Sequence, residues 1–273
     1  MIIKSPCKIN LGLKVLNKRK DNFHNILSIF IELNLFDTIE FIKSDLLSVQ
    51  FIGENIPANN TVTKAIKLIT KYYNIEINHK IIINKNIPIG SGLGGGSSNG
   101  AYILKAINQL YDLNISNREL LVLSKKIGSD VPFFIDGGIK EIRGTGDIIS
   151  QINYSELQNK YFLLVVPPFT ISTKWAYKKI KKHLHTPKIH PKFPPLTDKV
   201  DWSLFVNDFE QVVCSTYPEI LDIKKAFYKS GALYSSLSGS GSTVFGIYND
   251  MELANQAINC FDTYHTYLVT PNI

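Results

Sequence analysis

The chain has 273 residues, enough for two modest domains, since typical domains contain about 100–200 residues. Hydrophobic residues make up 44% and charged residues 19%, a balance that excludes a largely disordered chain. Residues 1–6 lack the apolar core of a secretory signal, and no run of about 18 apolar residues that could cross a membrane occurs. The three cysteines lie too far apart in sequence for a disulfide framework or a zinc site. We therefore expect a cytoplasmic protein without a membrane partner.

The net charge of +7 raises the question of nucleic-acid binding. The lysines are spread along the chain and no nucleic-acid-binding module is recognisable, so we expect no nucleic-acid partner. A basic surface also attracts small substrates that carry phosphate. The densest basic stretch, residues 178–192, contains His183, His185 and His190, which match no metal-ligand motif and are interpreted as a solvated helix end. No metal-ligating residue is predicted in this stretch.

The first half of the chain is predicted to open with strands and to continue with helices. Apolar and β-branched runs predict strands at 8–15, 25–33, 38–42, 47–52 and 80–83. Helical spacing of apolar residues predicts helices over 60–72 and after the glycine-rich segment at 87–98. A capping box of Ser116 with Glu119 begins a further helix, which ends at Gly128.

The second half alternates strands with helices. Strands are predicted at 139–142, 161–166, 232–237, 243–248 and 266–269, and helices at 173–182, 202–214, 217–229 and 251–261. The polar stretch 153–160 is the predicted domain boundary, which gives domains of residues 1–158 and 159–273. Strands and helices in both halves indicate an α+β or α/β fold.

The segment 87–98 contains five glycines between a predicted strand and a predicted helix. Glycine reaches left-handed dihedrals and lets backbone N–H groups approach a ligand closely. The start of the following helix adds free N–H donors and a positive dipole end, so the segment is suited to hold phosphates. The hydroxyls of Ser97 and Ser98 are candidates to cap that helix, to contact phosphate or to help place Mg²⁺. A flexible turn is the alternative.

Two other phosphate-binding patterns fit this loop less well. Gly90-x-Gly92-x-x-Gly95 matches the dinucleotide fingerprint, but the acidic residue at the expected distance, Asp112, sits at a helix end rather than after a second strand. The P-loop pattern requires a lysine before its final hydroxyl residue, whereas this loop ends in Gly96-Ser97-Ser98. A nicotinamide enzyme and a P-loop protein are both disfavoured.

The loop resembles a motif of the galactokinase, homoserine kinase, mevalonate kinase and phosphomevalonate kinase superfamily, Pro-x-x-x-Gly-Leu-Gly-Gly-Gly-Ser-Ser, at residues 88–98. Residues 6–11 and 238–242 resemble the first and third motifs of the same superfamily. The resemblance implies an α+β fold of two domains, the N-terminal one like domain 2 of ribosomal protein S5 and the C-terminal one ferredoxin-like, with the active site in the cleft between them. It also implies ATP as co-substrate with Mg²⁺. The implied ATP-binding residues are Pro88, Gly90, Ser91, Gly92, Leu93, Gly94, Gly95, Gly96, Ser97 and Ser98.

Four further segments, at 21–24, 128–134, 170–177 and 207–210, resemble a superfamily member whose small-molecule substrate carries a cytidine diphosphate group. Asn22, Phe23 and Ser129 depart from the usual pattern. Asn tolerates positive φ and Phe keeps an aromatic face, so the first two changes are compatible with the resemblance. Asn60 and Lys85 are expected near the adenine of ATP. The protein is expected to be a monomer or a homodimer.

By this resemblance, Asp130 accepts the proton of the substrate hydroxyl, and Lys8 orients Asp130 and stabilises developing negative charge. The implied substrate-binding residues are Asn10, Phe23, His24, Thr173 and Tyr177. Phe23 and Tyr177 are expected on opposite faces of the pyrimidine, His24 at its edge, and Thr173 and Asn10 near the sugar-alcohol or diphosphate part.

The residues taken alone leave other roles open. Asp130 is also compatible with a helix cap, and Lys8 with a solvated strand face. Phe23 also fits a turn residue packed on the core, and Tyr177 an apolar helical stripe. At the level of function, the alternatives are another kinase of the superfamily and a catalytically silent nucleotide-binding protein on the same fold.

Overall fold

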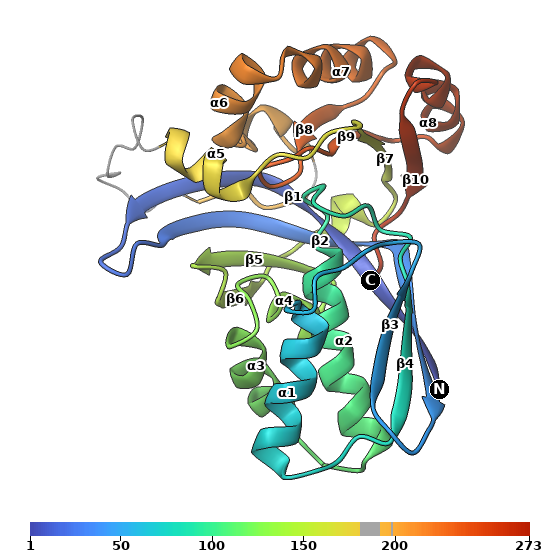
Figure 1. The fold of residues 1–273 in the computed structure, drawn as a ribbon. Coiled ribbons are helices and arrows are strands. Elements are labelled where there is room, and N and C mark those ends of the chain that lie inside the picture. Colours follow the sequence, from blue (N-terminus) through green and yellow to red (C-terminus); the bar gives the residue numbers. More distant parts are fainter. Residues whose placement is uncertain (181–191, 198) are drawn as a thin grey trace. The chain divides into compact units, whose positions relative to one another are not determined.

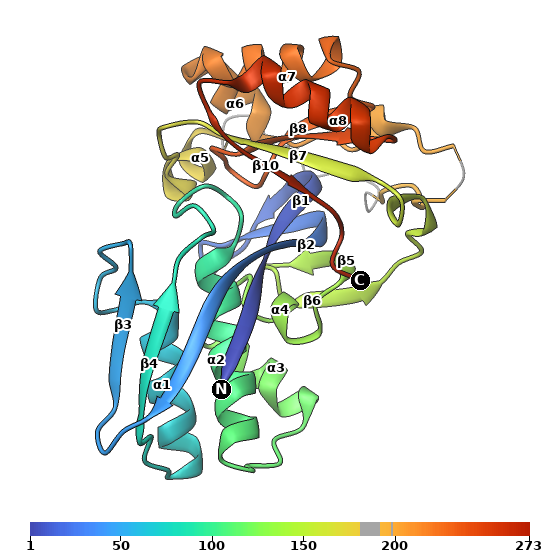
Figure 2. The ribbon, with the colours of Figure 1, turned by 90° about the vertical axis from the view of Figure 1, so that its right-hand side faces the viewer.

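The structure, a computed structural model, describes residues 1–180, 192–197 and 199–273 (Figure 1, Figure 2). The chain forms two compact units, each assembled from separate segments. The first unit consists of Met1–Cys7, Leu35–Ile89 and Gly94–Gly137. The second unit consists of Lys8–Asn34, Gly90–Leu93 and Gly138–Ile273. Strands β1 (Ile2–Lys18) and β2 (His24–Lys43) contribute residues to both units.

The first unit contains strands and most of the helices of the N-terminal half. Its helices are α1 (Thr61–Tyr73), α2 (Gly95–Leu110), α3 (Asn117–Lys125) and α4 (Phe133–Asp136). Strand β4 (His79–Asn84) pairs in parallel with β3 (Ser48–Ile52) and antiparallel with the C-terminal part of β2. Figure 1 shows α1 and α2 lying side by side.

Local sequence signals set the ends of two of these helices. Asn60 caps α1, because its side chain accepts a hydrogen bond from the backbone N–H of Thr63 at 3.0 Å. The capping box of Ser116 and Glu119 is present at the start of α3. On α1, the buried residues follow the predicted helical spacing, at Val62, Ala65, Ile66 and Ile69. Both helix starts are therefore confirmed as local features.

The second unit contains a four-stranded antiparallel sheet with the strand order β10-β7-β9-β8. Its strands are β7 (Tyr161–Val166), β8 (Tyr234–Leu237), β9 (Val244–Tyr248) and β10 (His265–Val269). Helix α7 (Pro218–Lys229) packs against β9, and α8 (Met251–Ile258) packs against β7 (Figure 2). Helices α5 (Thr173–Ile180) and α6 (Phe209–Thr216) pack against each other.

The rest of the second unit is built on the N-terminal part of β2, which pairs antiparallel with β5 (Ile139–Gly144). Strand β5 in turn pairs with β6 (Ile148–Gln151). Short 3₁₀ turns occur at Ser155–Leu157, Trp202–Leu204 and Asn259–Phe261. One apolar core joins the helices to the sheet, with Phe209, Phe227 and Phe261 all but fully buried.

Two predictions about elements are corrected, and two elements were not predicted. The strands expected at 25–33 and 38–42 form one strand, β2, because the polar residue Asp37 within it is satisfied by hydrogen bonds instead of ending the strand. The helix expected at 202–214 is a 3₁₀ turn followed by α6, because Asn207 and the backbone of Asp208 bond to other segments. Strand β6 and helix α4 were not predicted, and residues 181–182 of the expected helix 173–182 lie outside the described residues.

Among the described residues, no helix has both the length and the apolar character needed to cross a membrane. The domain boundary at residues 158 and 159 stays a prediction.

The packing of α7 on the sheet depends on Gly246 in β9. A methyl group at this position would lie 2.7 Å from Cε1 of Phe227, and a ring held in a packed core has little room to move. We expect Gly246→Ala to lower Tm by on the order of 5 °C through overpacking. The matched control is Gly128→Ala, whose nearest new contact is an ordinary 3.4 Å to Val131. Equal Tm values for both variants, measured by circular dichroism, would contradict this packing argument.

Candidate active site

The N-terminus of α2 is formed by the glycine-rich segment. Gly94 precedes the helix with a left-handed φ of 71°, and no side chain caps the first turn. A Cβ on Gly95 would lie 2.9 Å from Cγ2 of Ile87, so this glycine is required by packing. A Cβ on Gly96, which is exposed, would meet nothing closer than the hydroxyl of Thr61 at 3.6 Å. Gly96 lies in the first turn of α2, and the space beside its backbone is open. An anion can therefore come close to the backbone N–H groups there.

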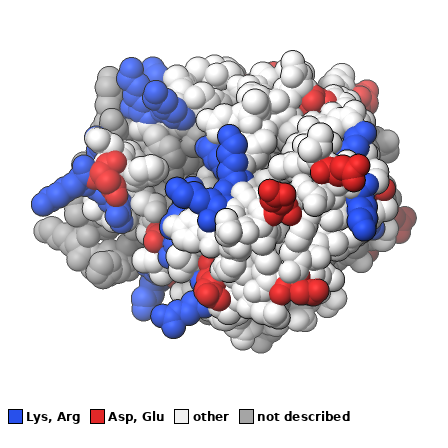
Figure 3. All heavy atoms as spheres, turned by 60° about the horizontal axis from the view of Figure 1, so that its bottom comes forward, with Lys and Arg blue, Asp and Glu red and all other residues white. Residues whose placement is uncertain are grey.

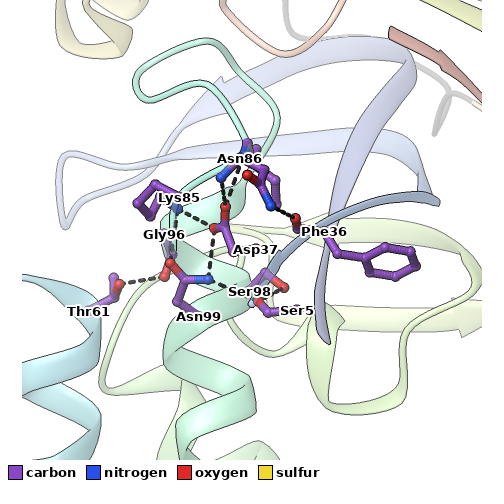
Figure 4. A network of polar contacts seen from close by, with 10 residues as sticks. Ser5, Phe36, Asp37, Thr61, Lys85, Asn86, Gly96, Ser98 and Asn99 are labelled. Carbon is purple, nitrogen blue, oxygen red and sulfur yellow. Dashed lines mark hydrogen bonds and ion pairs between the residues drawn. The ribbon is translucent and has the colours of Figure 1, made fainter. Parts of the chain in front are cut away.

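The hydroxyl of Ser98 faces the interior of the first unit. Ser98 is fully buried, and its Oγ lies 2.7 Å from Oγ of Ser5 in β1 (Figure 4). Ser97, by contrast, is half-buried. A role for Ser98 as a magnesium ligand would require its hydroxyl to leave Ser5, whereas a structural role requires no change.

The part of the loop that belongs to the second unit, Gly90–Leu93, is held by backbone and side-chain hydrogen bonds. Nζ of Lys8 donates to the carbonyl oxygen of Gly92 at 3.1 Å, and Oγ of Ser238 donates to the same oxygen at 3.0 Å. Gly92 has a φ of 85°, and a Cβ there would clash with the carbonyl oxygen of Ser238. The first and third superfamily motifs thus meet at one carbonyl group of the second.

Lys8 is buried, with 3% of its surface exposed, so the alternative of a solvated strand face is wrong. Its Nζ donates to Oδ1 of Asn10 at 2.6 Å and lies 4.7 Å from the ring centre of Phe30. Asn10 is fixed in turn, because its Nδ2 donates to Oγ of Ser28 at 3.1 Å. The ammonium group is therefore held in one position by acceptors and an aromatic face.

Asn207 is a buried residue of this site to which the sequence assigned no role. Its Nδ2 donates to the carbonyl oxygens of Leu237 at 2.7 Å and Gly239 at 2.8 Å. A Cβ on Gly239 would lie 3.3 Å from Oδ1 of Asn10 and 3.9 Å from Nζ of Lys8, so the backbone of Gly239 lies next to both side chains. By its hydrogen bond to Gly239, Asn207 fixes the position of this backbone. The signal that could have identified it is the resemblance of residues 207–210, which was noted without a role.

Asp208 and Glu210, the two acidic residues of segment 207–210, also hold backbone groups in place by hydrogen bonds. Oδ2 of Asp208 accepts a hydrogen bond from the N–H of Val15 at 2.8 Å, and burial raises the pKa of this carboxyl group against the opposing effects of that hydrogen bond and of Lys14. Oε1 of Glu210 accepts from the N–H of Leu237 at 2.9 Å. This short segment thereby ties β1 and β8 to the start of α6.

The predicted pyrimidine-binding residues in the second unit have different surroundings. The rings of His24 and Tyr177 stack with centroids 5.1 Å apart and an interplanar angle of 16°. Tyr177 is half-buried and contacts Phe209 edge to face at 4.9 Å, so it also serves the apolar core. Phe23 is 61% exposed, so the alternative that it packs on the core is wrong.

Two further expectations concern neighbours of these rings. Asn22 has a φ of 69°, a conformation that Asn tolerates better than most residues. Thr173 begins α5, and its hydroxyl lies 2.9 Å from Oγ of Ser240 in the third motif.

Asp130 lies in the first unit, in a turn before α4, and is half-buried. The residue at the N-cap of α4 is Pro132, and the residue at the C-cap of α3 is Lys126, so the alternative of a helix cap for Asp130 is wrong. Oγ of Ser129 lies 3.4 Å from its Oδ1. Of the predicted catalytic pair, Asp130 belongs to the first unit and Lys8 to the second.

On the face drawn in Figure 3, lysine and arginine side chains are interspersed with acidic and uncharged residues. Over the part of the chain that the structure describes, no group of three or more His, Cys, Asp or Glu side chains could hold a metal ion. His183, His185 and His190 lie outside the described residues.

Comparison with known proteins identifies the class to which this fold and site belong. Residues 60–138 match the family model of the N-terminal domain of GHMP kinases, and residues 201–265 match that of their C-terminal domain. The fold is shared with a crystal structure of mevalonate kinase, with a TM-score of 0.73 at 18% identity over 99% of each chain. The chain is therefore a GHMP kinase, an ATP-dependent phosphotransferase, and the α+β fold prediction is confirmed.

Relatives with higher sequence identity show to which family of GHMP kinases the chain belongs. A 4-diphosphocytidyl-2-C-methyl-D-erythritol kinase of Thermodesulfovibrio yellowstonii is 40% identical over 270 residues, which cover 96% of this chain and 94% of that protein. The 4-diphosphocytidyl-2-C-methyl-D-erythritol kinase of Chlorobium phaeobacteroides is 36% identical over 98% of this chain and 93% of that protein. A crystal structure titled 4-(cytidine 5'-diphospho)-2C-methyl-D-erythritol kinase aligns with a TM-score of 0.83 at 25% identity, over 99% of this chain and 98% of that one. This chain belongs to the 4-diphosphocytidyl-2-C-methyl-D-erythritol kinase family.

The open backbone at Gly96 allows a direct test of phosphate approach. We expect Gly96→Ala to weaken ATP binding about tenfold, because the methyl group would occupy space next to the free N–H groups, while Tm stays at the wild-type value. Gly95→Ala is the comparison, since it should lower Tm as well by displacing Ile87. Titration calorimetry with a non-hydrolysable ATP analogue measures the affinity. Wild-type affinity in Gly96→Ala would exclude close approach of phosphate at this residue.

Proposed function

We propose that this protein transfers the γ-phosphoryl group of ATP to the C2 hydroxyl of 4-diphosphocytidyl-2-C-methyl-D-erythritol, a step of non-mevalonate isoprenoid precursor biosynthesis. The observation that carries the proposal is the buried ammonium of Lys8, held at Asn10 and Gly92. It occurs in a chain 40% identical over nearly its full length to a kinase named for this substrate. Homoserine and mevalonate kinases share the fold, so the substrate is what separates the alternatives.

The chemistry assigns complementary tasks to two side chains. Phosphoryl transfer to an alcohol needs an acceptor for the hydroxyl proton and positive charge near the transferred group. We assign the proton to the carboxylate of Asp130 and the stabilisation of negative charge to the ammonium of Lys8. The two hydrogen bonds that Lys8 donates hold its ammonium group in place. The phosphates of ATP are assigned to residues 90–98 and to Pro88.

Magnesium neutralises phosphate oxygens in most kinases. Among the described residues no group of three or more His, Cys, Asp or Glu side chains could hold a metal ion, and the hydroxyl of Ser98 lies 2.7 Å from that of Ser5. We therefore propose that Mg²⁺ arrives with ATP and is coordinated mainly by phosphate oxygens and water.

Recognition of the cytidine diphosphate group is assigned to the second unit. Phe23 and Tyr177 are proposed to hold the two faces of the pyrimidine, with His24 at its edge and Asn10 and Thr173 near the rest of the substrate. The exposure of Phe23 leaves its ring available for stacking. Because His24 stacks on one face of Tyr177, a base on that face would have to displace the His24 ring, whereas a base on the other face would not.

The remaining parts of the proposal are a cytoplasmic location, the absence of a nucleic-acid partner, and a monomer or homodimer with a domain boundary after residue 158. The direct test of function is to incubate the purified protein with ATP, Mg²⁺ and the cytidylyl substrate and to look for ADP and a monophosphorylated product by mass. A catalytically silent protein would give neither, and another kinase of the superfamily would phosphorylate homoserine or mevalonate instead.

The catalytic pair can be tested one residue at a time. Asp130→Asn keeps the size but removes the proton acceptor, and Lys8→Ala removes the cation, so each should lower kcat by on the order of 100-fold or more. The affinity for ATP should change much less. Steady-state kinetics with both substrates gives these values. A kcat near that of the wild type in Asp130→Asn would remove the proton-accepting role.

The pyrimidine site gives a different kinetic signature. Stacking of a base on an aromatic ring contributes about 1–3 kcal/mol, so Phe23→Ala or Tyr177→Ala should raise KM for the cytidylyl substrate about tenfold. KM for ATP should hardly move. Phe23→Ala is the cleaner variant, because Tyr177 also packs on Phe209 and its loss should lower Tm. Wild-type KM in both variants, with both proteins folded, would show that the base binds elsewhere.

A further inference from the structure

A buried carboxylate in the first unit joins the two ends of the glycine-rich segment. Asp37 in β2 is fully buried. Its Oδ1 accepts hydrogen bonds from the backbone N–H groups of Asn86 and Ile87, each at 2.9 Å. Its Oδ2 accepts from Nδ2 of Asn99 at 2.9 Å and forms an ion pair with Lys85 (Figure 4). Four donors therefore converge on one side chain.

The donors come from both sides of the phosphate-binding segment. Asn86 and Ile87 directly precede residues 88–98, and Asn99 directly follows them. Asn99 also accepts from Nζ of Lys85 at 3.0 Å and donates to Oγ of Ser5 at 3.0 Å. The carboxylate thus fixes the separation between the point where the chain enters the loop and the first turns of α2.

The position of Ile87 matters to the helix start itself. Cγ2 of Ile87 lies 2.9 Å from where a Cβ on Gly95 would be, so the backbone of α2 rests directly on this side chain. The N–H groups of Ile87 and Asn86 are held by Asp37, and a displacement of this segment would displace the N-terminus of α2. That N-terminus is the part of the first unit suited to bind phosphate.

We propose that Asp37 is a positioning residue that holds the glycine-rich segment in the geometry required by the phosphates of ATP. Lys85 supports it by compensating the buried charge, and Asn99 supports it by linking the ion pair to α2 and to Ser5. A buried ion pair adds little net stability compared with apolar residues of the same volume, but it fixes geometry where its hydrogen bonds converge. The proposal rests on ATP being the phosphoryl donor of the proposed function.

The variant that tests it is Asp37→Asn, which keeps one oxygen acceptor but loses the charge and one acceptor. We expect KM for ATP, and Kd for a non-hydrolysable ATP analogue, to rise about tenfold. KM for the cytidylyl substrate should stay within about twofold of the wild type, because its proposed residues belong to the second unit. Asp136→Asn is the matched control, since this exposed carboxylate of the first unit only accepts from Asn117 at 2.9 Å.

A milder variant keeps the test decisive if Asp37→Asn does not fold. Asn99→Ala removes the link between the ion pair and α2 but leaves Asp37 and Lys85 paired, and it should raise Kd for the ATP analogue several-fold. Folding is checked by circular dichroism and Tm. A lower Tm with unchanged Kd and KM for ATP would overturn the proposal, because Asp37 would then serve stability alone. An equal rise in KM for both substrates would overturn it as well.

The same measurements distinguish a failure of the proposed function. If the wild-type protein binds the ATP analogue but does not phosphorylate the cytidylyl substrate, the substrate assignment fails while the calorimetric comparison of Asp37→Asn with Asp136→Asn still tests Asp37. If the wild-type protein does not bind the analogue, both proposals fall.

Discussion

A glycine-rich backbone has few side chains with which to pack, so its position depends strongly on polar groups from other parts of the chain. In the second unit, the carbonyl group of Gly92 receives hydrogen bonds from Lys8 and Ser238, residues that are far apart in the sequence. In the first unit, the segment beside Gly95 is held by the carboxylate of Asp37. The loop can therefore be open toward a ligand and still have a defined shape, because the side chains that bond to it, Lys8, Ser238 and Asp37, are buried.

Both units contain a buried charged side chain near the glycine-rich segment, and hydrogen bonds hold each of them. Asp37 and Lys85 neutralise each other as an ion pair. Lys8 donates to the oxygens of Asn10 and Gly92, which fix the position of its ammonium group. In both units the buried charge is thus fixed by directed hydrogen bonds, so that it keeps one geometry.

The GHMP kinases share the fold at low sequence identity, so the fold alone does not select a substrate. In this chain the aromatic residues assigned to the pyrimidine belong to the second unit, as do Lys8 and Asn10. The segment at 207–210 connects them, because Asn207 fixes the backbone at Gly239 while Phe209 packs on Tyr177. The same short segment thus supports both the surroundings of Lys8, the lysine proposed to act in catalysis, and the ring proposed to hold the base, which gives a physical reason for its resemblance to the family.

The sequence by itself determined the features that depend on neighbouring residues. The capping residues Asn60 and Ser116 follow from local backbone chemistry. The helix expected after residues 87–98 is also present, but it starts earlier, at Gly95. Only the tertiary structure decided where strands and helices break against their local pattern, and which side chains hold the loop. Asn207 bonds to a carbonyl group 30 residues away and Asp37 to N–H groups 49 and 50 residues away, so their roles arise from contacts that no local pattern encodes.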